Sequence, residues 1–323
     1  MTSVRRVVGS LCVVAASLTA MGAPSSADEG GASFWIPGQY GSFIAVPDEP
    51  GWTLPILFYA NKGNAGVEKR FTRGGVITTG LDGSGTLTLV SPTYTFRGTP
   101  LGGRASLGLG WGFGKMDVTS DATLTGPTGG VLERNVSDTY SGMSDLYPEG
   151  ALRWNDGTSN YMLYVMGGVP IGAYSADRLA SVGLGHGAID GGGAFTYYDQ
   201  PNGREVSAAL GFTYNFENPN THYQNGVDAH LDWAVSHFIN EDTHAGVVGY
   251  FYDQLSGDHG DGAALGDFQT EATAVGGELG HFFDAGESKW YGQVKAYWDI
   301  YTKNRVKGWN LWLSASVPLG KKS

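Results

Sequence analysis

Apolar and polar residues alternate along many stretches of this chain with a period of two. In residues 204–217 every even position from 206 to 216 is apolar, while the odd positions are small or polar. Residues 227–239 and 309–317 show a similar alternation, and in residues 107–114 large apolar residues alternate with glycine. Because the side chains of a β-strand point alternately to its two faces, this period predicts half-buried strands and an all-β fold.

The alternating runs are long for a soluble protein. Several extend over a dozen or so residues, whereas the strands of a soluble sandwich usually have about five or six. A tilted strand that crosses a bilayer needs about 9–11 residues. The pattern therefore favours a transmembrane antiparallel up-and-down β-barrel of about 12 strands, with 10 to 14 as the range. The expected strands are residues 52–60, 85–97, 102–114, 146–154, 158–171, 192–199, 204–216, 227–239, 243–254, 270–283, 288–301 and 308–319.

The connections between these strands alternate between tight and long. The links after the even-ranked strands are short turn sequences such as "NDG", "QPNG" and "NED". Short turns on the periplasmic side and long loops outside are typical of outer-membrane barrels, so both chain ends are expected on the periplasmic side. The long loops are expected at residues 61–84, 115–145, 172–191, 217–226 and 255–269.

Tryptophan and tyrosine gather near the ends of the expected strands. This is typical of the aromatic girdles that mark the two membrane interfaces. The alternative is the core of a soluble sandwich, where tryptophan would favour the middle of a strand. The residues expected in the girdles are Trp154, Tyr161, Tyr214, Trp290, Tyr291, Tyr301 and Trp309.

Composition and the first residues favour export to a membrane. Charged residues make up 16% of the chain, where soluble domains have about a quarter. Arg5 and Arg6 precede a short apolar run and a Ser-Ser-Ala sequence, which predicts a signal peptide over residues 1–27. No later apolar run is long enough for a transmembrane helix. The only cysteine, Cys12, lies within the expected signal, and the net charge of −11 argues against nucleic-acid binding.

An irregular and strongly apolar segment precedes the first expected strand. It reads "SFWIPGQYGSFIAVPDEPGW", where proline excludes a central strand and the apolar residues argue against an exposed loop. We expect residues 28–51 to form a plug inside the barrel or a cap across its periplasmic mouth, ahead of a barrel of residues 52–323. Residues 177–199 are a second candidate to enter the lumen. The residues expected to pack there are Phe34, Trp35, Pro37, Gln39, Tyr40, Phe43 and Trp52.

No catalytic pattern accompanies this barrel. Ser207 and His230 could be neighbours on paired strands, but neither lies in a recognisable lipase sequence. The histidines lack zinc-site spacing, so we expect no enzymatic activity, no metal and no cofactor. The expected lumen face carries only scattered charges, which suits an uncharged and partly apolar solute. The charged residues expected to line the pore are Glu205, Asp232, Lys295 and Asp299.

Three stretches together resemble a known family. They read "SFWIPGQYGSFIAVPDEPGWTLPILFYA", "DRLASVGLGHGAIDGGGAFTYYD" and "GWNLWLSASVPLG", in this order. They resemble the family named for the meta-pathway of phenol degradation, whose members are exported barrels described as outer-membrane transporters. The resemblance implies uptake of small hydrophobic, including aromatic, compounds, with outer-membrane lipid as the other partner. The alternative is a structural or adhesive outer-membrane protein whose acidic loops contact partners.

Overall fold

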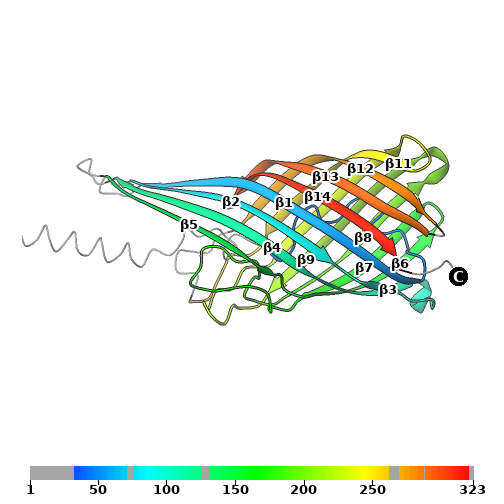
Figure 1. The fold of residues 1–323 in the computed structure, drawn as a ribbon, viewed down its shortest axis with the longest axis horizontal. Coiled ribbons are helices and arrows are strands. Elements are labelled where there is room, and N and C mark those ends of the chain that lie inside the picture. The colour runs from blue at the N-terminus through cyan, green and yellow to red at the C-terminus, as the bar shows by residue number, and fades with distance from the viewer. Residues whose placement is uncertain (1–32, 71–75, 126–130, 262–268, 287, 320–323) are drawn as a thin grey trace, which may run out of the picture.

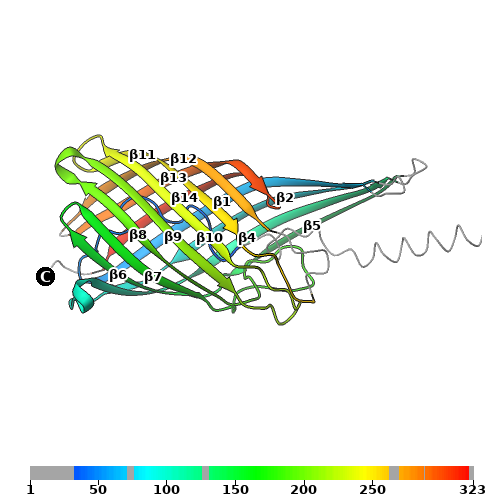
Figure 2. The same cartoon turned by 180° about the vertical axis from the view of Figure 1, so that it is seen from behind.

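The computed structural model describes residues 33–70, 76–125, 131–261, 269–286 and 288–319. The expected signal peptide lies outside these ranges. Among the described residues, no helix is long and apolar enough to cross a membrane. The described part of the chain is built from strands that wind around a common axis (Figures 1 and 2). Within it, two single-turn 3-10 helices, η2 (Pro100–Gly102) and η3 (Gln200–Asn202), lie in short turns.

The strands follow one another as antiparallel neighbours around the barrel, and β14 closes it by pairing with β1. The strands are β1 (Gly51–Arg70), β2 (Val76–Val90), β3 (Thr93–Thr95), β4 (Arg104–Thr125), β5 (Val131–Met143), β6 (Tyr147–Asp156), β7 (Ser159–Gly168), β8 (Ala188–Asp199), β9 (Arg204–Asn215), β10 (Asp228–Phe238), β11 (Thr243–Gln254), β12 (Glu271–Ala285), β13 (Ser288–Lys303) and β14 (Lys307–Pro318).

Two pairs of these strands each form one interrupted strand of the wall. β2 and β3 both pair with β1 and β4, and they are separated only by Ser91 and Pro92. β5 and β6 likewise share β4 as a partner and are separated by residues 144–146. Counting each pair once gives a closed antiparallel barrel of 12 strands, which confirms the prediction.

The outer face of the barrel is apolar because alternate positions of the strands point away from the axis. Large hydrophobic side chains are exposed on strands all around the wall. Such a continuous exposed apolar surface is unfavourable in water and suits the hydrocarbon core of a membrane. Examples are Leu107, Phe113, Leu163, Leu210, Phe251, Leu279, Trp298 and Leu313.

The prediction of long loops at residues 61–84 and 115–145 is wrong, because most of the described residues in these ranges belong to paired strands. The β1–β2 pairing continues to Arg70 opposite Val76, although β14 stops pairing with β1 at Asn64. The β4–β5 pairing extends in the same way, so four strands project beyond the barrel as a ribbon (Figures 1 and 2). These segments are rich in threonine, glycine and aspartate, which favour loops. Residues 115–125 nevertheless alternate between polar and mostly apolar positions, a strand signal that the prediction did not use.

Most of the aromatic residues expected in the girdles point outward near strand ends, as that prediction requires. Trp290, Tyr301 and Trp309 are about half exposed near strand ends, as expected for side chains that face an interface. Tyr291 is the exception, because its hydroxyl lies 2.8 Å from Nε2 of His244, a side chain buried inside the barrel. Adjacent strand residues point to opposite faces, so Trp290 and Tyr291 could not both face the membrane.

Candidate functional site

Residues 33–50, here called the inner segment, run through the barrel interior before entering β1 at Gly51. The segment forms no strand, since its prolines and the positive φ angles of Gly38 (85°) and Phe43 (67°) do not fit a β-ladder. Its side chains and backbone bind inward-facing residues instead. Its contacts follow β10 from one end to the other: Trp35 with His230, Gly38 with Asp232, Ser42 with Ser236, and Phe43 with Phe238.

Two opposite charges hold the backbone of residues 38–40. The Asp232 carboxylate accepts the N–H of Gly38 at 2.8 Å and the N–H of Tyr40 at 3.1 Å. From β13, the Lys295 ammonium donates to three successive carbonyls, those of Gly38 (2.7 Å), Gln39 (3.0 Å) and Tyr40 (2.9 Å). Asp232 and Lys295 thus form a backbone clamp, and charge-assisted hydrogen bonds of this kind are the stronger ones.

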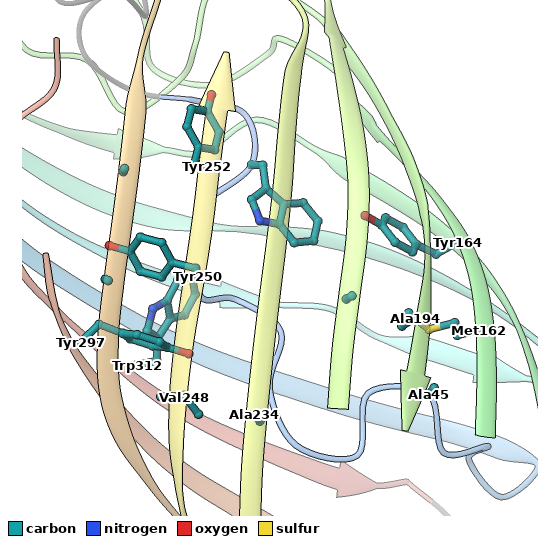
Figure 3. Close-up of a cluster of buried hydrophobic side chains, with 14 of the residues drawn as sticks. Ala45, Met162, Tyr164, Ala194, Ala234, Val248, Tyr250, Tyr252, Tyr297 and Trp312 are labelled. Carbon is teal, nitrogen blue, oxygen red and sulfur yellow. The ribbon is translucent and has the colours of Figure 1, made fainter. Parts of the chain in front are cut away.

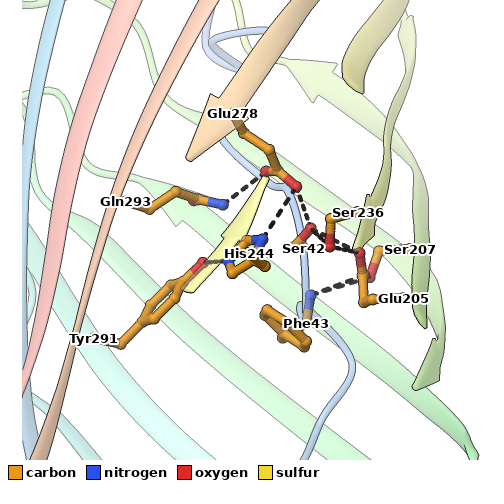
Figure 4. Close-up of polar contacts among 9 residues, drawn as sticks. All are labelled: Ser42, Phe43, Glu205, Ser207, Ser236, His244, Glu278, Tyr291 and Gln293. Carbon is orange, nitrogen blue, oxygen red and sulfur yellow. Dashed lines mark hydrogen bonds and ion pairs between the residues drawn. The ribbon is translucent and has the colours of Figure 1, made fainter. Parts of the chain in front are cut away.

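Further along the inner segment, Ser42 connects two buried carboxylates, those of Glu205 and Glu278 (Figure 4). Its hydroxyl lies 2.7 Å from Oε2 of Glu205 and also contacts Glu278, while the Phe43 N–H donates to Glu205 Oε1 at 3.1 Å. A hydroxyl has a single proton to donate and lone pairs that accept. Ser42 can therefore take part in several hydrogen bonds at once, and it links Glu205 of β9 to Glu278 of β12.

Aromatic side chains surround the inner segment at two levels. Trp35 stacks on His230 with ring centroids 3.6 Å apart, and Tyr164 and Tyr40 lie beside it. Figure 3 shows Tyr164 pointing from the wall into the interior. Near the short turns, Phe43 contacts five further rings, those of Tyr198, Phe238, His244, Phe282 and Tyr291.

The two ends of the inner segment are anchored at opposite ends of the barrel. Near the long loops, the Ser33 hydroxyl lies 3.3 Å from Nη1 of Arg305, and Phe34 packs with Leu184 of the 169–187 connection. Near the short turns, Arg153 donates from Nε to the Ile44 carbonyl at 3.1 Å. The segment therefore extends along the interior and is not confined to one mouth.

Six of the seven residues expected in the lumen belong to the inner segment and are buried or half-buried. The seventh, Trp52, was wrongly expected there. Phe34, Trp35 and Pro37 are buried, and Gln39, Tyr40 and Phe43 are half-buried. Trp52 belongs to β1, where it is 52% exposed and packs on Tyr94 of the neighbouring strand. The strand begins at Gly51, so the alternation of β1 places Trp52 on the outer face.

The four charged residues expected to line the pore all point inward. Glu205, Asp232 and Lys295 contact the inner segment, whereas Asp299 accepts the Tyr250 hydroxyl at 2.6 Å and the Gly308 N–H at 2.8 Å. Three further charged residues, which were not expected from the sequence, also contact the segment: Glu278, Glu149 and Arg153. Glu278 had the same signal as Glu205, since it is a charged residue on the polar face of an alternating strand. The missed residues and their contacts are Glu278 with Ser42, Glu149 with Tyr40, and Arg153 with Ile44.

The interior does not bring the considered Ser–His pair together. On the β9–β10 ladder, Ser207 lies opposite Ala234, whereas His230 lies opposite Gly211. His230 instead pairs with Asp190, and Ser207 bonds Thr196 at 2.7 Å. No group of three or more histidine, cysteine or acidic side chains suited to a metal occurs among the described residues.

The fold resembles solved outer-membrane barrels. An outer-membrane channel from Pseudomonas putida F1 matches with a TM-score of 0.64 at 15% identity, covering 86% of this chain and 98% of that one. A FadL homologue from Pseudomonas aeruginosa has a TM-score of 0.39 at 6% identity, covering 92% and 99%. The first similarity shows that the fold is that of an outer-membrane barrel.

Sequence comparison identifies a family as well. A family model described as "Putative MetA-pathway of phenol degradation" matches residues 68–315. No curated protein has a significant match to the chain.

Proposed function

The chain belongs to this family, and from that premise we propose that it is an outer-membrane channel for small hydrophobic compounds, aromatic ones among them. In this proposal the inner segment is the gate. The apolar outer face supports a position in the membrane, and the fold shared with the Pseudomonas putida channel supports a transport role. An enzymatic role has no support from the arrangement of Ser207 and His230.

The observation that carries the proposal is the way the interior is filled. The inner segment contacts the wall through hydrogen bonds and aromatic packing, and it continues into the wall only at Gly51. A lumen occupied by the wall's own side chains would be a solid core. A lumen occupied by a separate segment can open when that segment moves, at the cost of the contacts it makes.

Conductance in a planar bilayer tests the gate. Replacing residues 34–48 with a flexible Gly-Ser linker of equal length keeps the connection to β1 but removes the clamp and the aromatic contacts. We expect this variant to conduct steadily where the unaltered protein conducts rarely. An unchanged and low conductance would overturn the gating proposal.

Uptake in cells tests the solute class. A deletion strain complemented with the protein should accumulate labelled toluene faster than the strain without it, and a charged solute of similar size should enter both strains equally. Equal toluene uptake in the two strains would reject transport of hydrophobic compounds.

The ribbon beyond the barrel favours a second candidate function, attachment to surfaces or cells. On it Thr119 bonds Ser137 and Asp121 bonds Asn135, and this part of the strands starts where β1 stops pairing with β14. Replacing residues 66–80 with Asn-Gly would close the β1–β2 hairpin at Ala65 and Leu81, which already pair. Loss of attachment with unchanged toluene uptake would assign this function to the ribbon.

A further inference from the structure

The indole of Trp35 occupies a preformed recess in the barrel wall. It is 1% exposed and stacks on the His230 imidazole with an interplanar angle of 14°. The Tyr40 ring meets it edge-on at 4.9 Å, and the Tyr164 ring lies 6.0 Å away. Trp35 and Tyr40 belong to the inner segment, whereas His230 and Tyr164 belong to the wall, so the recess remains when the segment moves.

Two glycines make the recess flat. Gly192 of β8 and Gly211 of β9 are directly opposite each other on the ladder. A Cβ atom on Gly211 would lie 2.6 Å from Cε1 of His230, and one on Gly192 would lie 2.9 Å from Cε1 of Tyr164. Any other residue at these positions would push the two rings away from the wall, so the glycines allow His230 and Tyr164 to lie against the backbone.

Polar atoms in the recess are left without partners. Asp190 accepts His230 Nε2 at 2.9 Å and Thr213 Oγ1 at 2.6 Å, both through Oδ2. Its Oδ1, the His230 Nδ1 and the Tyr164 hydroxyl make no hydrogen bond of good geometry, although the Tyr164 hydroxyl faces Asp190 and both Asp190 and His230 are fully buried. Buried polar groups are normally paired, and unpaired ones cost free energy that a suitable ligand would recover.

We propose that this recess is a binding site for a planar aromatic solute that carries a hydroxyl group, and that Trp35 occupies it when the channel is closed. The proposal deepens the channel function and rests on it. The solute ring replaces the indole over His230, and its hydroxyl reaches the unpaired atoms of Asp190 and Tyr164. Since solute and Trp35 compete for one site, the solute favours the displaced inner segment and so promotes its own passage.

Equilibrium binding of phenol to the purified full-length protein in detergent tests the site. The Trp35→Ala variant removes the competitor, so it should bind phenol about tenfold more tightly than the unaltered protein, near the upper end of what an aromatic pair contributes. Trp312→Ala is the matched control, because Trp312 is another buried inward-facing indole but packs on Tyr59 and not on His230. It should give no such gain.

Two probes and one further variant separate stacking from hydrogen bonding. Toluene keeps the ring without the hydroxyl, and cyclohexanol keeps the hydroxyl without the planar ring. In the Trp35→Ala protein we expect phenol to bind most tightly, toluene several-fold more weakly and cyclohexanol least. Adding Tyr164→Phe, which removes only a hydroxyl, should weaken phenol binding and leave toluene binding unchanged.

Three outcomes would overturn the proposal. These are equal phenol binding by the Trp35→Ala and unaltered proteins, an equal gain in Trp312→Ala, or cyclohexanol binding as tight as phenol binding. Each variant should first migrate as a compact, heat-modifiable form in a gel, so that misfolding is not mistaken for lost binding. Because binding is measured without transport, a failure here is distinguishable from a failure of the conductance and uptake experiments.

Discussion

The Asp232 carboxylate accepts the backbone N–H of Gly38 at 2.8 Å, and so a wall strand holds a residue 194 positions earlier in the chain. The contact engages backbone and not side chain, and Lys295 engages the carbonyl of the same residue from the opposite side. Glycine suits this position, because its φ of 85° is strained for other residues and a Cβ would lie 3.0 Å from the Tyr297 ring. The clamp therefore fixes one turn of the inner segment to two strands.

Removing the clamp should open the channel. A hydrogen bond to a charged group contributes about 1.5–3 kcal/mol, so Asp232→Ala should raise the ratio of open to closed channels about ten- to hundredfold. Asp232→Asn should have a smaller effect, because its amide oxygen still accepts one N–H. Single-channel recording gives the open probability directly.

Asp242→Ala is the control for this change. Asp242 lies in an exposed turn, where it pairs with Lys289 at 2.8 Å. We expect its removal to leave the open probability unchanged. If both aspartate variants open the channel equally, the clamp does not hold the gate.

A disulfide should lock the inner segment to the wall. The hydroxyl oxygens of Ser42 and Ser236 are 3.2 Å apart, and both side chains are buried. In Ser42→Cys/Ser236→Cys the only other cysteine is Cys12, within the expected signal peptide. The two thiols are close enough to approach disulfide geometry with small adjustments.

The oxidised double variant should show no channel openings, and a reducing agent should restore the openings of the unaltered protein. Ser42→Cys alone should respond to neither treatment. Openings that persist in the fully oxidised protein would mean that solutes pass without movement of the segment around Ser42.

The barrel was predictable from the sequence because its physical cause is local. A membrane on one side and a polar interior on the other impose a period of two on every wall strand, and Leu210 beside Gly211 already shows it. The ribbon was predictable only in part. Residues 115–125 alternate between polar residues at odd positions and mostly apolar ones at even positions, which fits a strand, whereas residues 61–66 and 133–139 show no such alternation.

The site was predictable only in part. The burial of Trp35 followed from the mismatch between an apolar sequence and an irregular backbone, and inward charges such as Asp232 followed from strand alternation. Which wall residue contacts which residue of the inner segment could not be predicted. Strand register fixes the neighbours of residues on paired strands, and the inner segment is not part of any strand. Trp52 was assigned to the lumen although it begins the expected first strand, because residues 52–60 are apolar at odd and even positions alike and do not show which face is outward.

The effect of replacing an outward-facing glycine of the wall with alanine should depend on the atoms that the new Cβ meets. A Cβ on Gly249 would lie 2.5 Å from Cε2 of Trp233, which is directly opposite on β10. Gly249→Ala should therefore displace the indole and destabilise the barrel by about 1–3 kcal/mol, as overpacking usually does. The urea midpoint of unfolding in detergent measures the change.

Gly277→Ala on the adjacent strand is the matched substitution. There the Cβ would meet only the Gly246 carbonyl oxygen, at an ordinary 3.7 Å. We expect it to be neutral or to stabilise the barrel by about 0.4–1 kcal/mol through reduced freedom of the unfolded chain. Equal destabilisation by both variants would contradict the role of Trp233.

Low pH should stabilise the connection after β11. Burial raises the pKa of Asp258, despite hydrogen bonds from Tyr223, Gln254 and the Gly226 N–H that favour its charged form. A carboxyl whose pKa is higher in the folded state binds more protons there. The connection is therefore most stable below the unfolded pKa and loses stability as the pH rises through the folded value.

Amide hydrogen exchange of residues 255–261, corrected for the intrinsic pH dependence of exchange, should show more protection at pH 4 than at pH 7. Asp258→Asn, which is neutral throughout, should remove this difference while keeping a side-chain oxygen for Gln254 and Gly226. Glu217→Gln is the control, because Glu217 is exposed on the neighbouring connection and pairs with His222. If protection instead increases with pH, the hydrogen bonds to Asp258 outweigh its burial and the sign of this prediction is wrong.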